Sequence, residues 1–132
     1  MLDPEKAMEI AELARVEAKR FFGIPEEIKI HLTATRREEN KLAQLYYLDA
    51  YLEADLQFDP SQMDSLQECW ETIAHEVAHL ESREILHAAQ LLEKEEHKIF
   101  REIQVAIEKL TVRRTRDFLR AHPWREEGTH AE

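Results

Sequence analysis

The stretch that decides the fold is Trp70-Glu71-Thr72-Ile73-Ala74-His75-Glu76-Val77-Ala78-His79-Leu80. Its apolar residues recur at helical spacing, which predicts a helix with one face turned toward a hydrophobic core. His75 and His79 project from one side of that helix about one turn apart, so both imidazoles can bind the same metal ion. Glu76 stands beside the first imidazole, where metal-assisted hydrolysis needs a general base. The pattern therefore favours a metal-dependent hydrolase.

A second interpretation of the two histidines needs no metal. Imidazoles at the edge of a packed helix can each bond to a backbone carbonyl, while Glu76 stays solvated. The chain holds 7 His and 22 Glu in 132 residues, so the pattern H-E-x-x-H arises by chance in roughly one of twenty shuffled sequences. The apolar residues on both sides of the motif favour the metal site.

The composition is that of one small globular domain. The chain has 132 residues, 43% hydrophobic and 35% charged, and we expect one domain over residues 1–124 and a mobile tail at 125–132. The formal net charge of −10 argues against a nucleic-acid partner, because nucleic-acid binding relies on Lys and Arg to neutralise phosphates. Cys69 is the only cysteine, so the metal ligands must be His and carboxylates.

No targeting signal is recognisable in the sequence. Residues 1–6 lack the basic start and apolar run of a signal peptide. No window approaches the length of a membrane span, so no membrane partner is expected. We therefore predict a cytoplasmic location.

The elements before the motif are a helix and a small sheet. Asp3 is a good N-cap and Gly23 a good stop, which predicts a helix over residues 4–22. Alternating apolar and polar residues then predict an antiparallel sheet with strands at 28–34, 42–48 and 51–58. The middle strand has an alternative, because residues 42–52 also fit a helix.

The second half of the chain is predicted to be helical. Between Gln62 and Pro123 there is neither Gly nor Pro. One helix of that length is unusual in a compact domain, so we predict a turn near 81–83 and one or more helices from 84 to about 120. Their inward stripe is expected to be Ile99, Ile103, Ala106, Ile107 and Leu110. The fold class is α+β: an N-terminal helix, the antiparallel three-stranded sheet, the motif helix and a long C-terminal helix that bears a glutamate.

A catalytic zinc takes three protein ligands and keeps a fourth position open. The extended motif H-E-x-x-H-x-x-G-x-x-H is excluded, because Ser82 and Ile85 occupy the positions of its Gly and third His. The third ligand must then lie on the following helix. Glu102 is the preferred candidate, because it shares a face with the expected inward stripe, from which Glu108 points away. The alternatives are Glu96 first, then Glu95, His97 and His87.

The motif, the strand-like segment before it and the glutamate-bearing helix after it resemble the gluzincin metallopeptidases, in the minimal form of the minigluzincins and related small phage or prokaryotic proteins. The resemblance covers about residues 26 to 110 and is specific only at the motif. It implies a zincin-like fold, a peptide or protein substrate, and hydrolysis by a zinc-bound water with Glu76 as general base. By resemblance, the sheet's edge strand beside the cleft binds the substrate main chain, a role that would fall to residues 51–58.

Two rival functions remain open. A zincin-like module could bind metal and regulate a partner without catalysis, and a helical interaction protein could bind no metal at all. Glu76 favours the enzyme, because a purely structural metal site has no need of a base and normally closes its fourth position. The oligomeric state cannot be inferred at this level.

Overall fold

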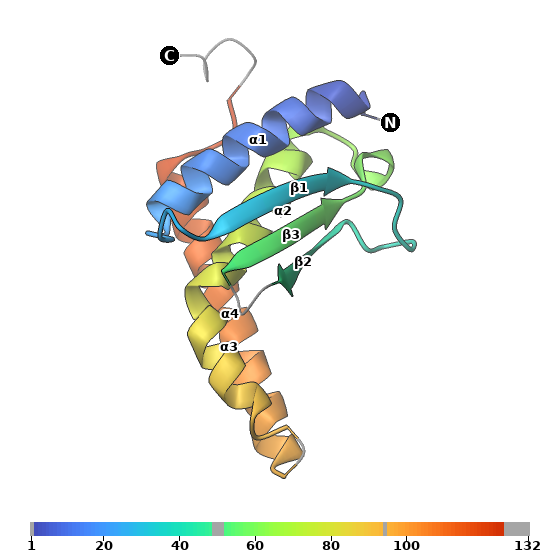
Figure 1. The fold of residues 1–132 in the computed structure, drawn as a ribbon. Coiled ribbons are helices and arrows are strands. Elements are labelled where there is room, and N and C mark those ends of the chain that lie inside the picture. Colours follow the sequence, from blue (N-terminus) through green and yellow to red (C-terminus); the bar gives the residue numbers. More distant parts are fainter. Residues whose placement is uncertain (1, 49–51, 94, 126–132) are drawn as a thin grey trace.

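The structure is a computed structural model that describes residues 2–48, 52–93 and 95–125. The elements are α1 (Pro4–Phe21), β1 (Lys29–Ala34), β2 (Ala43–Leu48), β3 (Glu53–Phe58), α2 (Leu66–Ala78), α3 (Arg83–Gln90) and α4 (His97–Ala121). The 3-10 turns η2 (Pro60–Gln62) and η3 (His79–Ser82) precede and follow α2. The α+β class is confirmed: α1 and α2 pack with a small sheet, and α3 and α4 form a hairpin that projects from this body (Figure 1).

Helix α1 begins and ends where the sequence predicts. The carboxylate of Asp3 accepts the N–H of Glu5 at 3.3 Å, and Pro4 occupies the first turn, where a missing N–H costs nothing. Gly23 has φ +64°, a left-handed conformation that lets the N–H of Ile24 reach the carbonyl of Lys19 at 3.0 Å. The buried face of α1 consists of Ile10 and four alanines, whose small side chains allow close packing against α2: Ala7, Ala11, Ala14 and Ala18.

The sheet is mixed, so the prediction of an antiparallel sheet is wrong. β3 lies in the centre, paired parallel with β1 and antiparallel with β2. Ala54, Leu56 and Phe58 on β3 are fully buried, whereas Leu45 is the one buried residue of β2. The central position between two neighbouring strands is therefore taken by β3, the strand with the most buried apolar side chains. Alternation identifies strands, including the uncertain one at 42–48, but it carries no information about their order.

A network around Asp59 holds the loop that carries the chain from β1 across to β2. The N–H of Arg37 donates to Asp59 Oδ2 at 2.9 Å, and the N–H of Asn40 donates to Gln62 Oε1 at 2.9 Å. Desolvation raises the pKa of the buried Asp59 carboxyl, but hydrogen bonds from Ser61, Gln62 and two backbone N–H groups outweigh it and lower the pKa to about 2. An ionised, fully bonded carboxylate thus fastens the crossing loop to the end of β3.

The helical half of the chain turns twice. After α2 the chain passes through η3, close to the predicted turn at 81–83, and it reverses direction between α3 and α4, where the sequence has neither Gly nor Pro. Three residues of the predicted inward stripe are exposed, so the prediction is wrong for them: Ile99, Ala106 and Leu110. The buried residues of α4 are Phe100, Thr111, Thr115 and Phe118. The first half of α4 extends beyond the body, so its apolar residues have no core to face.

A cluster of rings attaches the C-terminal half of α4 to the body. Phe118 is fully buried, and its ring centroid lies 5.6 Å from Phe21, 5.8 Å from Phe22 and 6.0 Å from Trp70. The indole N–H of Trp70 donates to the carbonyl of His122 at 3.0 Å. These contacts join α4 to both α1 and α2 and fix its position along the motif helix.

Two further expectations concern the C-terminal tail and membrane-spanning segments. The predicted mobile tail at 125–132 lies outside the described residues except for Arg125. Within the described ranges, no helix combines the length and apolar character that crossing a bilayer requires.

Candidate metal centre

The local sequence of α2 sets the direction of the two histidines. Ser65 caps the helix, its hydroxyl accepting the N–H of Glu68 at 3.1 Å. Trp70, Ile73 and Val77 bury one face against the core, which turns the opposite face toward an open pocket. The imidazoles of His75 and His79 lie there with ring centroids 5.0 Å apart and planes at 87°. The predicted pair on one face of a helix is present.

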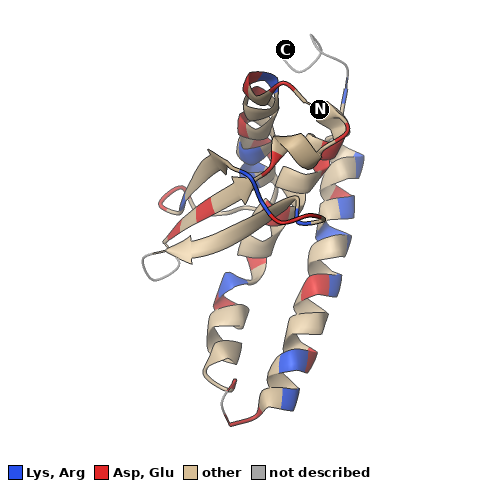
Figure 2. Cartoon of the chain, turned by 90° about the vertical axis from the view of Figure 1, so that its right-hand side faces the viewer, with Lys and Arg blue, Asp and Glu red and all other residues tan. Residues whose placement is uncertain are grey.

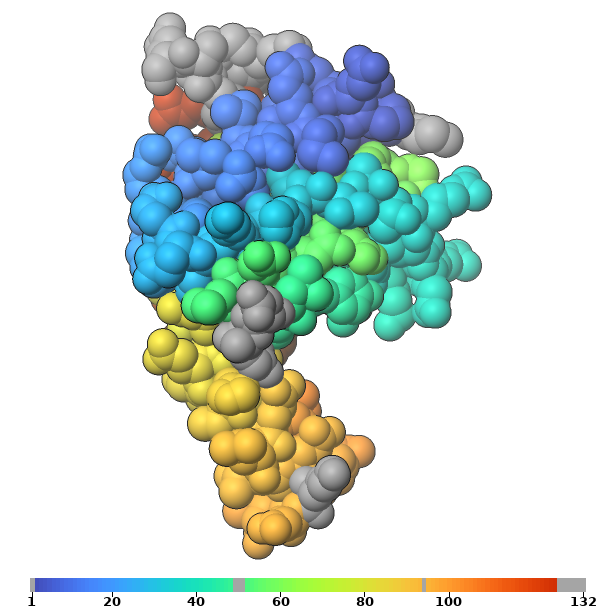
Figure 3. Space-filling model, viewed as in Figure 1, coloured from blue at the N-terminus to red at the C-terminus, as the bar shows by residue number. Residues whose placement is uncertain are grey.

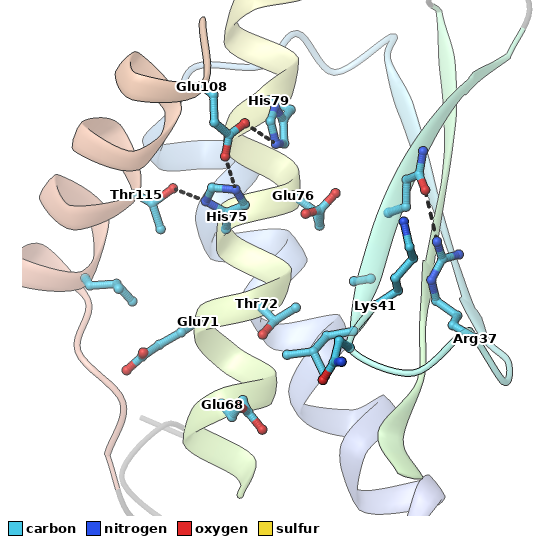
Figure 4. Close-up of a pocket in the computed structure, with 15 residues that line it drawn as sticks. Arg37, Lys41, Glu68, Glu71, Thr72, His75, Glu76, His79, Glu108 and Thr115 are labelled. Carbon is cyan, nitrogen blue, oxygen red and sulfur yellow. Dashed lines mark hydrogen bonds and ion pairs between the residues drawn. The ribbon is translucent and has the colours of Figure 1, made fainter. Parts of the chain in front are cut away.

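Two carboxylates meet this pair from different sides. Glu108 of α4 places Oε1 3.1 Å from Nε2 of His75 and Oε2 3.5 Å from Nε2 of His79 (Figure 4). Glu76 also offers an oxygen, and this atom and one nitrogen of each histidine all lie within 4.8 Å of one another. In Figure 4 Glu76 lies on the side of the histidines that faces the sheet, whereas Glu108 points both oxygens at the ring nitrogens. Glu108 thus has the better geometry for a third ligand, and Glu76 lies beside the histidines on their sheet side (Figure 4).

Glu108 is not the residue that the sequence favoured. Glu102 is exposed on α4 and is not among the described residues that line the pocket. The same holds for the alternatives at the hairpin, which are Glu96, Glu95, His97 and His87. A helical wheel centred on Ile99 and Leu110, which are exposed, turns Glu108 away from the expected inner face of α4. A wheel centred on the buried Phe100, Thr111 and Phe118 brings Glu108 to the edge of the buried face.

Thr115 is a residue that sequence reasoning missed. Its hydroxyl donates to the carbonyl of Thr111 at 2.7 Å, and its oxygen lies 3.4 Å from Nδ1 of His75. With the hydroxyl proton engaged, the oxygen can accept the Nδ1–H of the imidazole. In a neutral imidazole this bond would leave Nε2, the nitrogen beside Glu108, as the one that can bind a metal. The only signal in the sequence is the spacing of Glu108, Thr111 and Thr115, which places all three along adjoining lines of one helix.

The centre is partly removed from water, which alters its ionisable groups. Burial raises the pKa of Glu76 to about 7; a hydrogen bond from the Leu45 N–H opposes this, the charge of Glu108 adds to it, and Arg37 opposes it. Burial also lowers the pKa of His79, against the charge of Glu108. Neutral imidazole is the form that binds a metal, and a carboxyl that exchanges its proton near neutrality suits acid–base work.

The pocket lies between α2, α4 and β2 and has a volume of about 720 Å³. Leu42, Ala43 and Gln44 line it from the sheet side. The edge strand beside the pocket is therefore β2, and the expectation that residues 51–58 form it is wrong. β3 pairs on both sides, so its backbone groups are already used within the sheet.

An ion pair fastens α4 close to the centre. Arg114 donates from Nε to Glu81 Oε1 at 2.9 Å and from Nη2 to Oε2 at 3.0 Å, a two-bond contact. The guanidinium carbon also lies 5.5 Å from the ring centroids of Phe21 and Phe22. Glu81 follows the motif directly, so this contact sets how α4, with Glu108, lies against the histidines.

Comparisons with protein-family models, curated proteins and solved structures find no match for this chain. Its function is therefore inferred from its own residues.

Proposed function

We propose that the protein is a zinc-dependent peptidase in which His75, His79 and Glu108 bind the metal and Glu76 is the general base. The observation that supports this most is the contact of the Glu108 carboxylate with both imidazoles, at 3.1 and 3.5 Å, beside the half-buried Glu76. Two imidazole nitrogens and one carboxylate are a donor set that catalytic zinc sites use when one position stays open. Zn²⁺ held there would supply the Lewis acidity that peptide hydrolysis requires.

The remaining roles in the proposed reaction fall to side chains of the protein. Glu76 accepts a proton from the attacking water and passes it to the leaving amine. Thr115 keeps Nε2 of His75 free of a proton, and Arg114 keeps α4 in place through Glu81. Each function depends on a side chain whose position is set by buried contacts of α2 or α4.

The cleft suits an extended peptide. β2 borders it as an edge strand, and such an edge can pair with the main chain of a peptide. Arg37 and Lys41 line the pocket from the sheet side, whereas Glu68 and Glu71 line it from α2. A peptide or protein is therefore the proposed substrate. The cytoplasmic location and the absence of a nucleic-acid partner stay predictions from the sequence.

The first experiment tests the ligands with a matched pair of variants. Glu108→Ala and Glu102→Ala each remove one exposed carboxylate from α4. Competition against a chromophoric zinc chelator should show that Glu108→Ala weakens zinc binding by more than about a hundredfold, while Glu102→Ala binds as the parent does. Equal affinity of all three proteins would exclude Glu108 as a ligand.

The second experiment separates catalysis from binding. Glu76→Gln keeps the shape of the side chain and removes its basicity, so it should bind zinc as the parent does and lose peptide cleavage. Cleavage of a peptide library by the zinc-loaded parent, read by mass spectrometry, provides the reference. A parent that binds zinc but cleaves no peptide would favour the metal-binding regulatory module, and a parent that takes up no zinc would refute both.

A further inference from the structure

Many apolar side chains of the α3–α4 hairpin stay exposed, because the contact between the two helices does not cover them. It projects from the body as a narrow arm (Figures 1 and 3). Among the described residues between 83 and 110, only Ala89 and Phe100 are buried, and neither belongs to the core cluster of the body. Several aliphatic side chains remain open to solvent, with Ile85 55%, Ile99 45%, Leu92 38% and Leu110 37% exposed.

These side chains form one stripe on each helix. On α3 and the turn that follows, the stripe is Ile85, Ala88 and Leu92; on α4 it is Ile99, Ile103, Ala106 and Leu110. The spacings of three and four residues are those of helices that pack along a shared seam. At 100° per residue, the stripe on each helix lies about 90° around the helix axis from the residues that face the other helix. The direction of this rotation is the same on both helices. Because α3 and α4 run antiparallel (Figure 2), both stripes fall on the same side of the arm, which we name the apolar face.

We infer that the apolar face is a self-association surface on which a second copy of this chain packs, arm against arm. Together its seven side chains expose on the order of 500 Å² per chain, the size of the largest apolar patch on a typical monomer, and such a patch is often functional. Two copies would bury about 1,000 Å², the lower end for a specific interface. The expected product is a reversible dimer built around a four-helix arrangement.

The charges beside the stripe of α4 favour a second copy as the occupant. On α4, which begins at His97, Glu102 flanks the stripe toward the tip of the arm, and Lys109 flanks the same side toward the body. Antiparallel pairing of two α4 helices would bring Glu102 of each copy to Lys109 of the other, which is the self-complementarity that a two-fold interface requires. This arrangement also places the two bodies at opposite ends.

The interface and the metal centre use different sides of α4. Glu108 lies roughly half a turn from the stripe, on the side that faces His75. Association would therefore leave the histidine pair accessible. The inference does not depend on zinc binding or on peptide cleavage.

Sedimentation velocity of the full chain over a range of concentrations tests the interface. The parent should shift from 15.7 kDa toward twice that mass, about 31 kDa, as concentration rises. Ile99→Lys places a charge in the stripe and should raise the dissociation constant at least about tenfold. Val105→Lys is the matched control, because Val105 is also exposed on α4, at 55%, but outside the stripe, and it should dimerise as the parent does. Circular dichroism checks that each variant keeps its helices.

A charge exchange tests the orientation. Glu102→Lys should weaken the dimer several-fold at low salt, and the double variant Glu102→Lys, Lys109→Glu should recover the parent's dissociation constant. A parent that stays monomeric at the highest concentration would overturn the inference. Equal weakening of the dimer by Ile99→Lys and Val105→Lys would also overturn it. Failure of the double variant to recover would overturn the antiparallel pairing.

Discussion

Replacing Thr115 by Val tests whether a hydroxyl outside the ligand set tunes the metal centre. Valine has nearly the same shape, so the buried packing of α4 changes little. What is lost is the oxygen 3.4 Å from Nδ1 of His75, and the imidazole N–H then has no acceptor there. An unsatisfied buried donor costs about 1–3 kcal/mol, and the long distance places this contact near the lower end. A loss of about 1.4 kcal/mol corresponds to tenfold weaker zinc binding.

Thr111→Val provides the control for this experiment. Thr111 is buried on the same helix, but its hydroxyl donates to the carbonyl of Ile107 at 2.9 Å and not to a histidine. Chelator competition should therefore show normal zinc affinity for Thr111→Val and restored affinity for Thr115→Ser. Nitrogen-15 spectra of the zinc-loaded parent should show His75 protonated at Nδ1, because Nε2 would then bind the metal. Equal affinity of Thr115→Val and the parent would refute the role assigned to the hydroxyl.

Three further predictions concern the scaffold. Phe118→Ala should lower the free energy of unfolding by about 3–5 kcal/mol in urea titrations, because aromatic rings surround this fully buried side chain; a loss below about 1 kcal/mol would contradict the ring cluster. Arg114→Lys keeps the charge but loses the two-bond contact with Glu81, so thermal unfolding should reveal a loss of about 1 kcal/mol. The pKa of Asp59 is lowered from 3.8 to about 2, so its contribution is complete above pH 3.8 and disappears as the pH falls toward 2. Between pH 5 and pH 2 the parent should thus lose about 2 kcal/mol more stability than Asp59→Asn, and parallel acid titrations of the two proteins would disprove this.

The sequence predicts elements well where a local signal defines them. Asp3, Pro4 and Gly23 specify the ends of α1 through caps and a left-handed residue, and the structure places the helix there. The histidine pair follows from helical periodicity alone, because its two members are one turn apart. Neither conclusion needs knowledge of the rest of the chain.

The order of the strands and the partner of the histidines depend on long-range contacts. β3 enters the centre of the sheet because the loop before β2 is tied to Asp59 and Gln62, which lie beyond β3 in the sequence. Glu108 was misjudged for a related reason. The pattern on α4 contains two apolar lines, and periodicity cannot tell which of them faces the body and which one stays open.

The separation of His75 and Glu108 by 33 residues has a thermodynamic consequence. An unfolded chain retains only the histidine pair, because the carboxylate arrives when α4 docks on the body. A metal that binds the three groups together would therefore bind the native state and not the unfolded one. Mass action would then add about 2.7 kcal/mol to the native state when free zinc is a hundred times the dissociation constant. The supply of metal would thus set the stability of the folded chain as well as the occupancy of its site.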